Sequence, residues 1–150
     1  MQENVLDIMN QDIVSMSPND DVKTAAFLMK KYNIGCVPIL SDLKIIGLLT
    51  DRDIVVRCLY QNTNTSLIKV SQIMTTDLVF IKETDTISKA LKVMTAKKVM
   101  RLPVISLFGS FSGIISFSDI ASLHAGPEVA LTISNIAKRN TRKNQNIKTM

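Results

Sequence analysis

The chain carries one unit of sequence twice. A shift of 65 residues brings an aspartate, an alanine, a methionine and a proline of the first half onto identical residues of the second. After one extra residue in the second half, Gly47 falls on Gly113 and Asp53 falls on Asp119. Self-similarity of this kind indicates two copies of one supersecondary unit. We expect the copies at residues 5–60 and 70–125, joined by a polar linker at 61–69.

Each copy is expected to contain an amphipathic helix. Val22, Ala25 and Met29 recur at helical spacing in the first copy, and matching apolar residues recur in the second. Acidic or hydroxyl residues that can act as N-caps precede both segments. We therefore predict helices at about 22–32 and 87–97. The segments before them are interpreted as helical turns at 5–9 and 70–74, followed by extended stretches at 13–16 and 78–81.

Two apolar runs follow each helix and are typical of a β-hairpin. They are Cys36–Leu40 and Ile45–Leu49 in the first copy, and Leu102–Leu107 and Gly113–Phe117 in the second. A further helix is expected after each hairpin. The resulting β-α-β-β-α unit is too small to bury both faces of its sheet. We expect an α/β fold in which the two repeats pack sheet to sheet with pseudo-two-fold symmetry.

The positive charge is concentrated at the C-terminus. Of the 18 Lys and Arg residues, five lie within 138–150, so the rest of the chain balances its 13 Asp and Glu residues. After the helix-breaking pair Gly126-Pro127 we expect a short C-terminal helix over 126–138, and then a disordered basic tail over 139–150. Contact of this tail with phosphate or with an acidic partner stays open.

Several classes of protein are disfavoured by what the sequence lacks. No apolar run approaches the length of a membrane span, and the N-terminus lacks the basic region of a signal peptide, so we expect a cytoplasmic protein without membrane contact. Cys36 and Cys58 form no CxxC pair and belong to no cluster with metal-ligand spacing. With one histidine, His124, and no nucleophile or P-loop motif, we expect no enzyme activity and no metal site.

The end of each hairpin carries the pattern Gly-x-x-[Thr/Ser]-x-x-Asp. A hydroxyl followed three residues later by a carboxylate is typical of a capping box at a helix start. A helix start is also an anion site, and an aspartate there can accept hydrogen bonds from two vicinal ribose hydroxyls. In the first copy Thr50 and Arg52 can then face a phosphate, with Asp53 on the sugar. The cap and the nucleotide site are compatible interpretations.

The chain resembles a tandem pair of CBS (cystathionine-β-synthase) domains, a Bateman module of the small stand-alone bacterial type. The resemblance extends from about Val5 to Leu123 and depends on the two in-register motifs and on Pro38 and Pro103 before them. It implies regulatory binding of an adenosine-containing ligand, such as AMP, ADP, ATP or S-adenosylmethionine, in clefts between the repeats. It also implies a homodimer that signals to a regulated partner protein.

The resemblance assigns residues of both repeats to each of two sites. Site one would use Thr50, Arg52, Asp53, Thr76, Asp77, Leu78, Val99, Met100, Arg101 and Pro103. Site two would use Ser116, Asp119, Gln11, Asp12, Ile13, Ile34, Gly35 and Pro38. The two arginines occur only in the first set, so we expect a phosphate-bearing nucleotide to prefer site one. In site two, Phe117-Ser118 departs from the family pattern, and this site is either empty or binds a nucleoside.

Two other functions stay open at this point. The first is a nucleic-acid or protein interaction module that acts through the basic C-terminal tail. The second is a structural dimer whose capping boxes bind no ligand.

Overall fold

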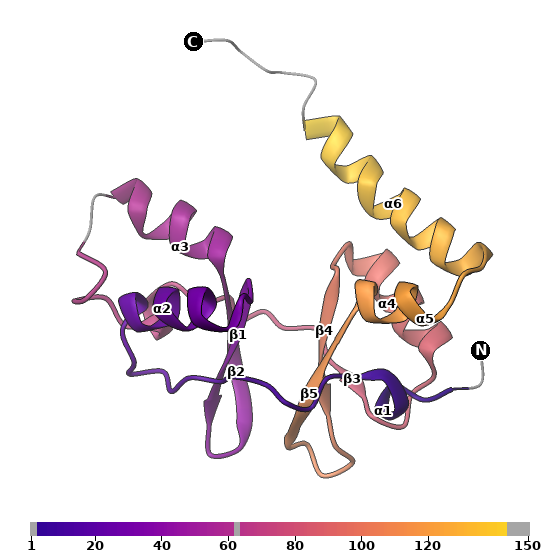
Figure 1. Ribbon diagram of the computed structural model, residues 1–150, viewed down its shortest axis with the longest axis horizontal. Helices are drawn as coiled ribbons and strands as arrows, with labels where there is room; N and C mark the ends of the chain where they lie inside the picture. Colours follow the sequence, from indigo (N-terminus) through magenta and orange to yellow (C-terminus); the bar gives the residue numbers. More distant parts are fainter. Residues whose placement is uncertain (1–2, 62–63, 144–150) are drawn as a thin grey trace. The chain divides into compact units, whose positions relative to one another are not determined.

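The structure, a computed structural model, describes residues 3–61 and 64–143, with the backbone alone described from residue 139 onward. The chain forms two compact units (Figure 1). The first unit comprises Asp12–Leu78 and Gly109–Phe111, and the second unit takes the remaining described segments. No helix in the described part of the chain has the length and apolar character needed to cross a membrane.

The first unit is built around a two-stranded antiparallel sheet. Two residues of its hairpin turn, Asp42 and Leu43, have positive φ angles of 50° and 64°. Positive φ at both central residues allows a two-residue turn that matches the twist of the strands. The elements of this unit are α2 (Val22–Tyr32), β1 (Cys36–Ser41), β2 (Lys44–Thr50), α3 (Asp51–Arg57) and the 3-10 turns η1 (Leu59–Gln61) and η2 (Val70–Gln72).

The second unit repeats this plan around a three-stranded sheet of order β3-β4-β5, in which β3 runs parallel to β4. Its elements are α1 (Val5–Ile8), β3 (Ile81–Lys82), α4 (Ile87–Lys97), β4 (Arg101–Ile105), β5 (Phe111–Ser116), α5 (Phe117–Leu123) and α6 (Pro127–Lys143). The two β-α-β-β-α repeats expected from the sequence are confirmed, but the first strand of the first copy, expected at 13–16, is reduced to a single parallel bridge between Met16 and Ile39.

The amphipathic helices α2 and α4 begin and end where the sequence predicts. Asp21 caps α2 by accepting a hydrogen bond from the Thr24 amide, and Thr86 caps α4 by accepting one from the Lys89 amide. Asn33 and Lys98, with φ angles of 52° and 55°, end the two helices in the left-handed conformation. A residue in this conformation is a common helix stop, since it turns the chain away from the helix axis.

Each compact unit takes its first helical turn from the other sequence repeat. Val5 is fully buried in the core of the second unit, and its amide donates to the Asp85 carbonyl at 2.8 Å. Val70 is fully buried in the core of the first unit, and its amide donates to the Asp20 carbonyl at 2.8 Å. The repeats of the sequence and the compact units of the structure therefore differ in their first residues.

The glycine of each hairpin motif is required by a close approach of these exchanged segments. Asn10 and Ile114 exchange backbone hydrogen bonds of 2.8 and 3.0 Å, and a Cβ on Gly113 would lie 2.5 Å from the Asn10 carbonyl oxygen. In the first unit, a Cβ on Gly47 would lie 2.3 Å from the Met74 sulfur. A side chain at either position would collide with the segment that crosses the strand.

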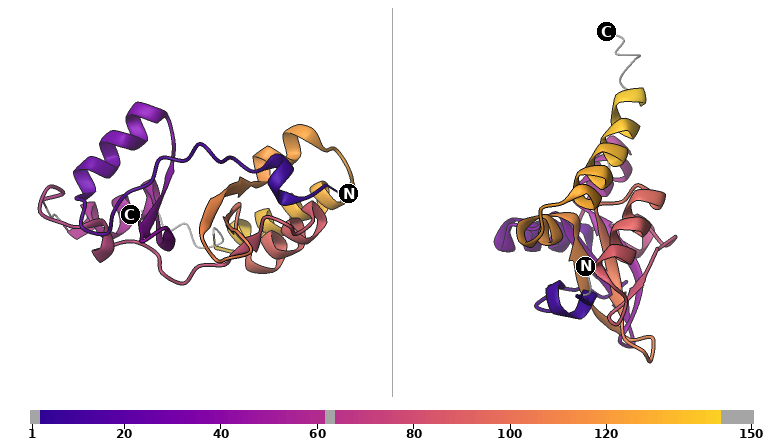
Figure 2. Two further views of the ribbon diagram at one scale, coloured as in Figure 1. Left: turned by 90° about the horizontal axis from the view of Figure 1, so that it is seen from below. Right: turned by 90° about the vertical axis from the view of Figure 1, so that its right-hand side faces the viewer.

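The C-terminal helix α6 packs along α4 (Figure 2). The Thr132 side chain is 3% exposed, and its hydroxyl lies 3.0 Å from the Thr95 hydroxyl. Ser88 donates to Glu128 at 3.1 Å, which ties the start of α6 to the start of α4. The helix passes the expected end at residue 138 and continues to Lys143, because no glycine or proline occurs between residues 128 and 143. Residues 144–150 of the expected tail lie outside the described residues.

A pH-dependent contribution to stability is expected from Asp85, just before α4. Burial raises the pKa of this carboxyl. Its pKa is lowered by more than this through hydrogen bonds from the Lys89 side chain at 2.7 Å and from the Lys82 amide, and through the charges of both lysines. The net pKa therefore lies below the ordinary 3.8. A lowered folded-state pKa stabilises the fold above the unfolded-state pKa, and this contribution is lost as pH falls through the folded-state pKa. Asp85→Asn should therefore cost about 0.5–1 kcal/mol near pH 7, because Lys89 is half exposed.

Thermal unfolding of wild type and Asp85→Asn from pH 7 down to pH 2.5 measures this effect. The melting temperatures should differ at neutral pH and converge as the pH falls through the folded-state pKa of Asp85, which lies below 3.8. The matched control is Lys89→Met, which removes one partner of Asp85 and should reproduce part of the loss. A difference that is constant over this pH range would contradict the assignment.

Candidate ligand-binding site

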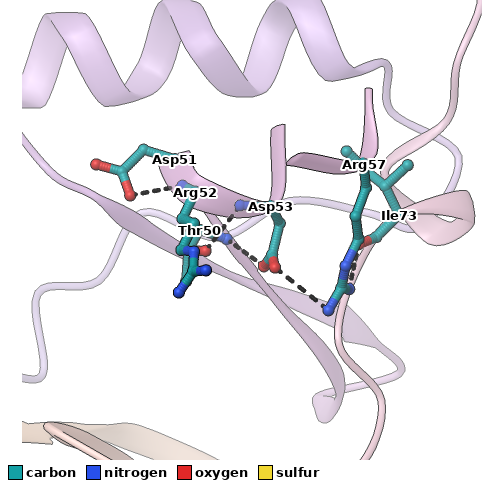
Figure 3. A network of polar contacts seen from close by, with 6 residues as sticks. All are labelled: Thr50, Asp51, Arg52, Asp53, Arg57 and Ile73. Atoms are coloured by element: carbon teal, nitrogen blue, oxygen red, sulfur yellow. Dashed lines mark hydrogen bonds and ion pairs between the residues drawn. The ribbon is translucent and has the colours of Figure 1, made fainter. Parts of the chain in front are cut away.

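The capping box at Thr50 joins the end of β2 to the start of α3 (Figure 3). The Thr50 hydroxyl accepts a hydrogen bond from the Asp53 amide at 3.1 Å, and Asp53 Oδ2 accepts one from the Thr50 amide at 2.9 Å. The Asp53 side chain is 13% exposed. The box therefore anchors one oxygen of a carboxylate that is largely, but not fully, shielded from solvent.

Arg57, which sequence reasoning missed, holds the other oxygen of this carboxylate. Its guanidinium lies 3.4 Å from Asp53 Oδ1 and donates to the Ile73 carbonyl at 2.8 Å (Figure 3). The spacing of four residues between an acid and a base on one helix is the signal that could have found the pair. Arg57 thus connects α3 to the segment that leads toward Thr76.

The first amides of α3 are all satisfied within the first unit. The Asp51 amide donates to the Gly35 carbonyl at 3.1 Å, the Arg52 amide to Asp51 Oδ1 at 2.8 Å, and the Asp53 amide to the Thr50 hydroxyl at 3.1 Å. These three amides are therefore not free to bind an anion at this helix start. The box and the Gly35 turn use these donors instead, so an anion here would depend on side chains.

Arg52 is one such side chain. It is exposed, and its guanidinium has no partner in the part of the chain that the structure describes. In Figure 3 it lies on the other side of Asp53 from Arg57. Of the arginines in α3, one is thus committed to the fold and the other is available.

The segment after η2 lies beside the end of β2. Thr75 and Leu48 exchange backbone hydrogen bonds of 2.8 and 3.0 Å, which fixes this segment two residues before Thr50. Thr76 and Asp77 are exposed, and the Leu78 amide donates to the Thr76 carbonyl at 3.0 Å. The first unit therefore contains six of the residues expected at site one: Thr50, Arg52, Asp53, Thr76, Asp77 and Leu78.

The second unit holds a similar box at the start of α5. Asp119 Oδ2 accepts from the Ser116 amide at 2.8 Å and from the Ser116 hydroxyl at 2.5 Å. The Phe117 amide donates to the Met100 carbonyl at 2.7 Å, as Asp51 does to Gly35 in the first unit. The position that corresponds to Arg57 is occupied by Leu123, which is 66% exposed. Asp119 therefore lacks the arginine that holds its counterpart.

The other expected residues differ in their exposure. Arg101 and Met100 are exposed at the start of β4, and Val99 is half-buried just before it. Pro38 and Pro103 are buried inside β1 and β4. Of the rest, Gln11 and Asp12 are exposed, and Ile13, Ile34 and Gly35 are half-buried.

The described residues contain no group of three or more His, Cys, Asp and Glu side chains that could hold a metal ion. His124 Nε2 lies 2.7 Å from Glu3 Oε2, which ties the end of α5 to the N-terminal segment. This histidine thus has a structural partner.

The repeated unit, the hairpin and the box define the class of protein to which this chain belongs. It is a member of the CBS domain family, whose model matches residues 5–59 and 70–126. The chain is 31% identical over 137 residues to the CBS domain-containing protein YhcV of Bacillus subtilis (strain 168), covering 91% of this chain and 96% of YhcV. It is thus a CBS-pair regulatory module similar to stand-alone CBS proteins.

Two further similarities bear on function. Inosine-5′-monophosphate dehydrogenase of Methanocaldococcus jannaschii is 32% identical over 125 residues, which cover 83% of this chain but 24% of that enzyme. The CBS domain pair of protein MJ0100, solved in complex with 5′-methylthioadenosine and S-adenosyl-L-methionine, superposes with a TM-score of 0.72 at 25% identity. This similarity covers 82% of this chain and 96% of that one.

Proposed function

We propose that the chain is a non-enzymatic sensor that binds an adenosine-containing ligand, such as AMP, ADP, ATP or S-adenosylmethionine. The observation that carries the proposal is the hydroxyl–carboxylate box, present in both copies, whose aspartate is partly exposed in each. A carboxylate has about four lone-pair sites and can serve the box and two vicinal hydroxyls together. The adenosyl ligands of the MJ0100 CBS pair support the same ligand class.

The phosphate of a nucleotide would be held by side chains at site one. The amides of the α3 start are occupied, while Arg52 is exposed and without a partner among the described residues. Arginine binds phosphate well because its planar fork offers parallel donors. The residues assigned to site one from the second unit, Arg101 above all, belong to this proposal. Site two has no arginine in its assigned set, which favours a nucleoside there.

Signalling to a regulated protein requires that the ligand favour one arrangement of the module over another. We also propose that the chain forms a homodimer. An exposed apolar face on α3 and η1 supports it, because Val55, Val56, Leu59 and Tyr60 are 56%, 51%, 56% and 87% exposed. Exposed apolar patches of this kind mark contact surfaces in proteins.

Two measurements test the ligand class. Mass spectrometry of the small molecules released from purified protein should detect an adenosine compound in stoichiometric amount. A thermal-shift screen with AMP, ADP, ATP, S-adenosylmethionine and adenosine should raise the melting temperature, since a ligand of the folded state stabilises it by mass action. Guanosine and cytidine nucleotides are the matched controls. No response to any adenosine compound at millimolar concentration would overturn the proposal.

A further inference from the structure

Arg57 contacts two segments of the first unit that carry residues expected at site one. These are the start of α3, at Asp53, and the segment that leads from Ile73 to Thr76. One nitrogen of the Arg57 guanidinium lies 3.4 Å from Asp53 Oδ1, and another donates to the Ile73 carbonyl at 2.8 Å. Asp53 is 13% exposed and Arg57 45% exposed, so the pair is partly shielded from water. The carboxylate and the segment leading to Thr76 are therefore held by a single side chain.

The second copy of the unit provides an internal comparison. Its box has the same length and the same backbone bonds, but Leu123 occupies the position of Arg57. The Ser116 hydroxyl lies 2.5 Å from Asp119 Oδ2, the same oxygen that accepts a hydrogen bond from the Ser116 amide. The two carboxylates thus differ in what fixes them, although their boxes are alike.

We propose that Arg57 is a positioning residue that makes site one selective for a ribose with both hydroxyls. This inference rests on the function proposed above. With Oδ2 held by the Thr50 amide and Oδ1 by Arg57, the plane of the Asp53 carboxylate is fixed from two directions. A fixed carboxylate can distinguish two vicinal hydroxyls from one, because only the full pair matches both of its oxygens. Without Arg57 the carboxylate can turn about its last bond and adapt to a single hydroxyl.

Arg57 also anchors the segment that follows η2. Its bond to the Ile73 carbonyl precedes the two Leu48–Thr75 hydrogen bonds, so the chain is anchored just before the exposed residues Thr76 and Asp77. Preorganisation of this kind lowers the entropy lost on binding. The same side chain thus affects both the sugar selectivity and the order of the segment.

Calorimetry with ATP and 2′-deoxy-ATP tests the proposal in full-length protein that carries Asp119→Ala, so that site one alone is measured. Arg57→Leu, which copies the second repeat, should lower ATP affinity about tenfold, since a hydrogen bond to a charged group contributes that much. It should also bring the ratio of the two affinities close to one. Arg57→Lys should restore part of the affinity, because an ammonium cannot reach both partners in the same fork geometry.

Arg52→Leu is the matched control. It removes an equal charge from the same helix and should weaken both nucleotides alike, which leaves their ratio unchanged. Hydrogen exchange without ligand gives a second measurement, in which the Thr75 amide should exchange faster in Arg57→Leu than in Arg52→Leu.

The outcomes separate the two proposals. An Arg57→Leu protein that keeps the wild-type ratio of affinities overturns the positioning role while the adenosine site stands. An unchanged exchange rate at Thr75 also overturns it. If the background protein binds neither nucleotide, the proposed site one fails, and the role of Arg57 fails with it.

Discussion

Asp53→Asn should weaken ATP binding about a hundredfold in calorimetry. The side chain is proposed to accept two ribose hydroxyls, and each hydrogen bond to a charged acceptor contributes about 1.5–3 kcal/mol. An asparagine oxygen can still accept the Thr50 amide that Asp53 accepts now at 2.9 Å, so the capping box and the fold are retained. Asp53→Ala should give at least the same loss of affinity, together with a lower melting temperature.

Asp119→Asn is the matched control, because Asp119 has the same place in the box of the second copy. It should change ATP affinity far less, since the set assigned to site two has no arginine for a phosphate. Equal losses in the two variants would show that the sites do not differ in nucleotide preference. Unchanged affinity in Asp53→Asn would remove the carboxylate from the binding site altogether.

Gly113→Ala should lower the melting temperature by roughly 10 °C, from a loss of about 3 kcal/mol. The new methyl carbon would lie 2.5 Å from the Asn10 carbonyl oxygen, and that backbone group cannot turn away without losing its bond to Ile114. The N-terminal segment would have to leave its place, and the buried Val5 would move with it.

Gly47→Ala should cost less, because the nearest atoms belong to the flexible Met74 side chain. The control is Gly126→Ala, where no atom lies within 4 Å of the added carbon. Differential scanning calorimetry of the three variants orders these effects. If Gly113→Ala and Gly126→Ala have the same melting temperature, the close approach of the N-terminal segment is not a constraint on the fold.

The parts of the fold that the sequence predicts are those set by local chemistry. The bounds of α2 and α4 follow from apolar spacing and from caps at Asp21 and Thr86, and the structure confirms both. The hairpins are confirmed as well. The turn of the first hairpin is harder to predict from the sequence, because Leu43 has a positive φ angle, which leucine rarely adopts.

The parts that the sequence does not predict depend on contacts between distant segments. The apolar spacing predicts a helical turn at Val5 but does not predict in the core of which unit this residue is buried. The sequence pattern predicts the capping box at Thr50, whereas the hydrogen bonds from the α3 amides to Gly35 and Asp51 depend on how the chain folds. The role of Arg57 is not predicted for the same reason, since one of its two contacts is a hydrogen bond to the Ile73 carbonyl sixteen residues away.

The exchange of opening turns makes the duplication mutually obligatory. A chain cut within the linker at 61–69 would leave each fragment with the turn that completes its neighbour and without the one that fills its own interior. Neither half is then a self-sufficient folding unit. Exchange of this turn with a second molecule would complete a single copy in the same way, as in a domain-swapped dimer.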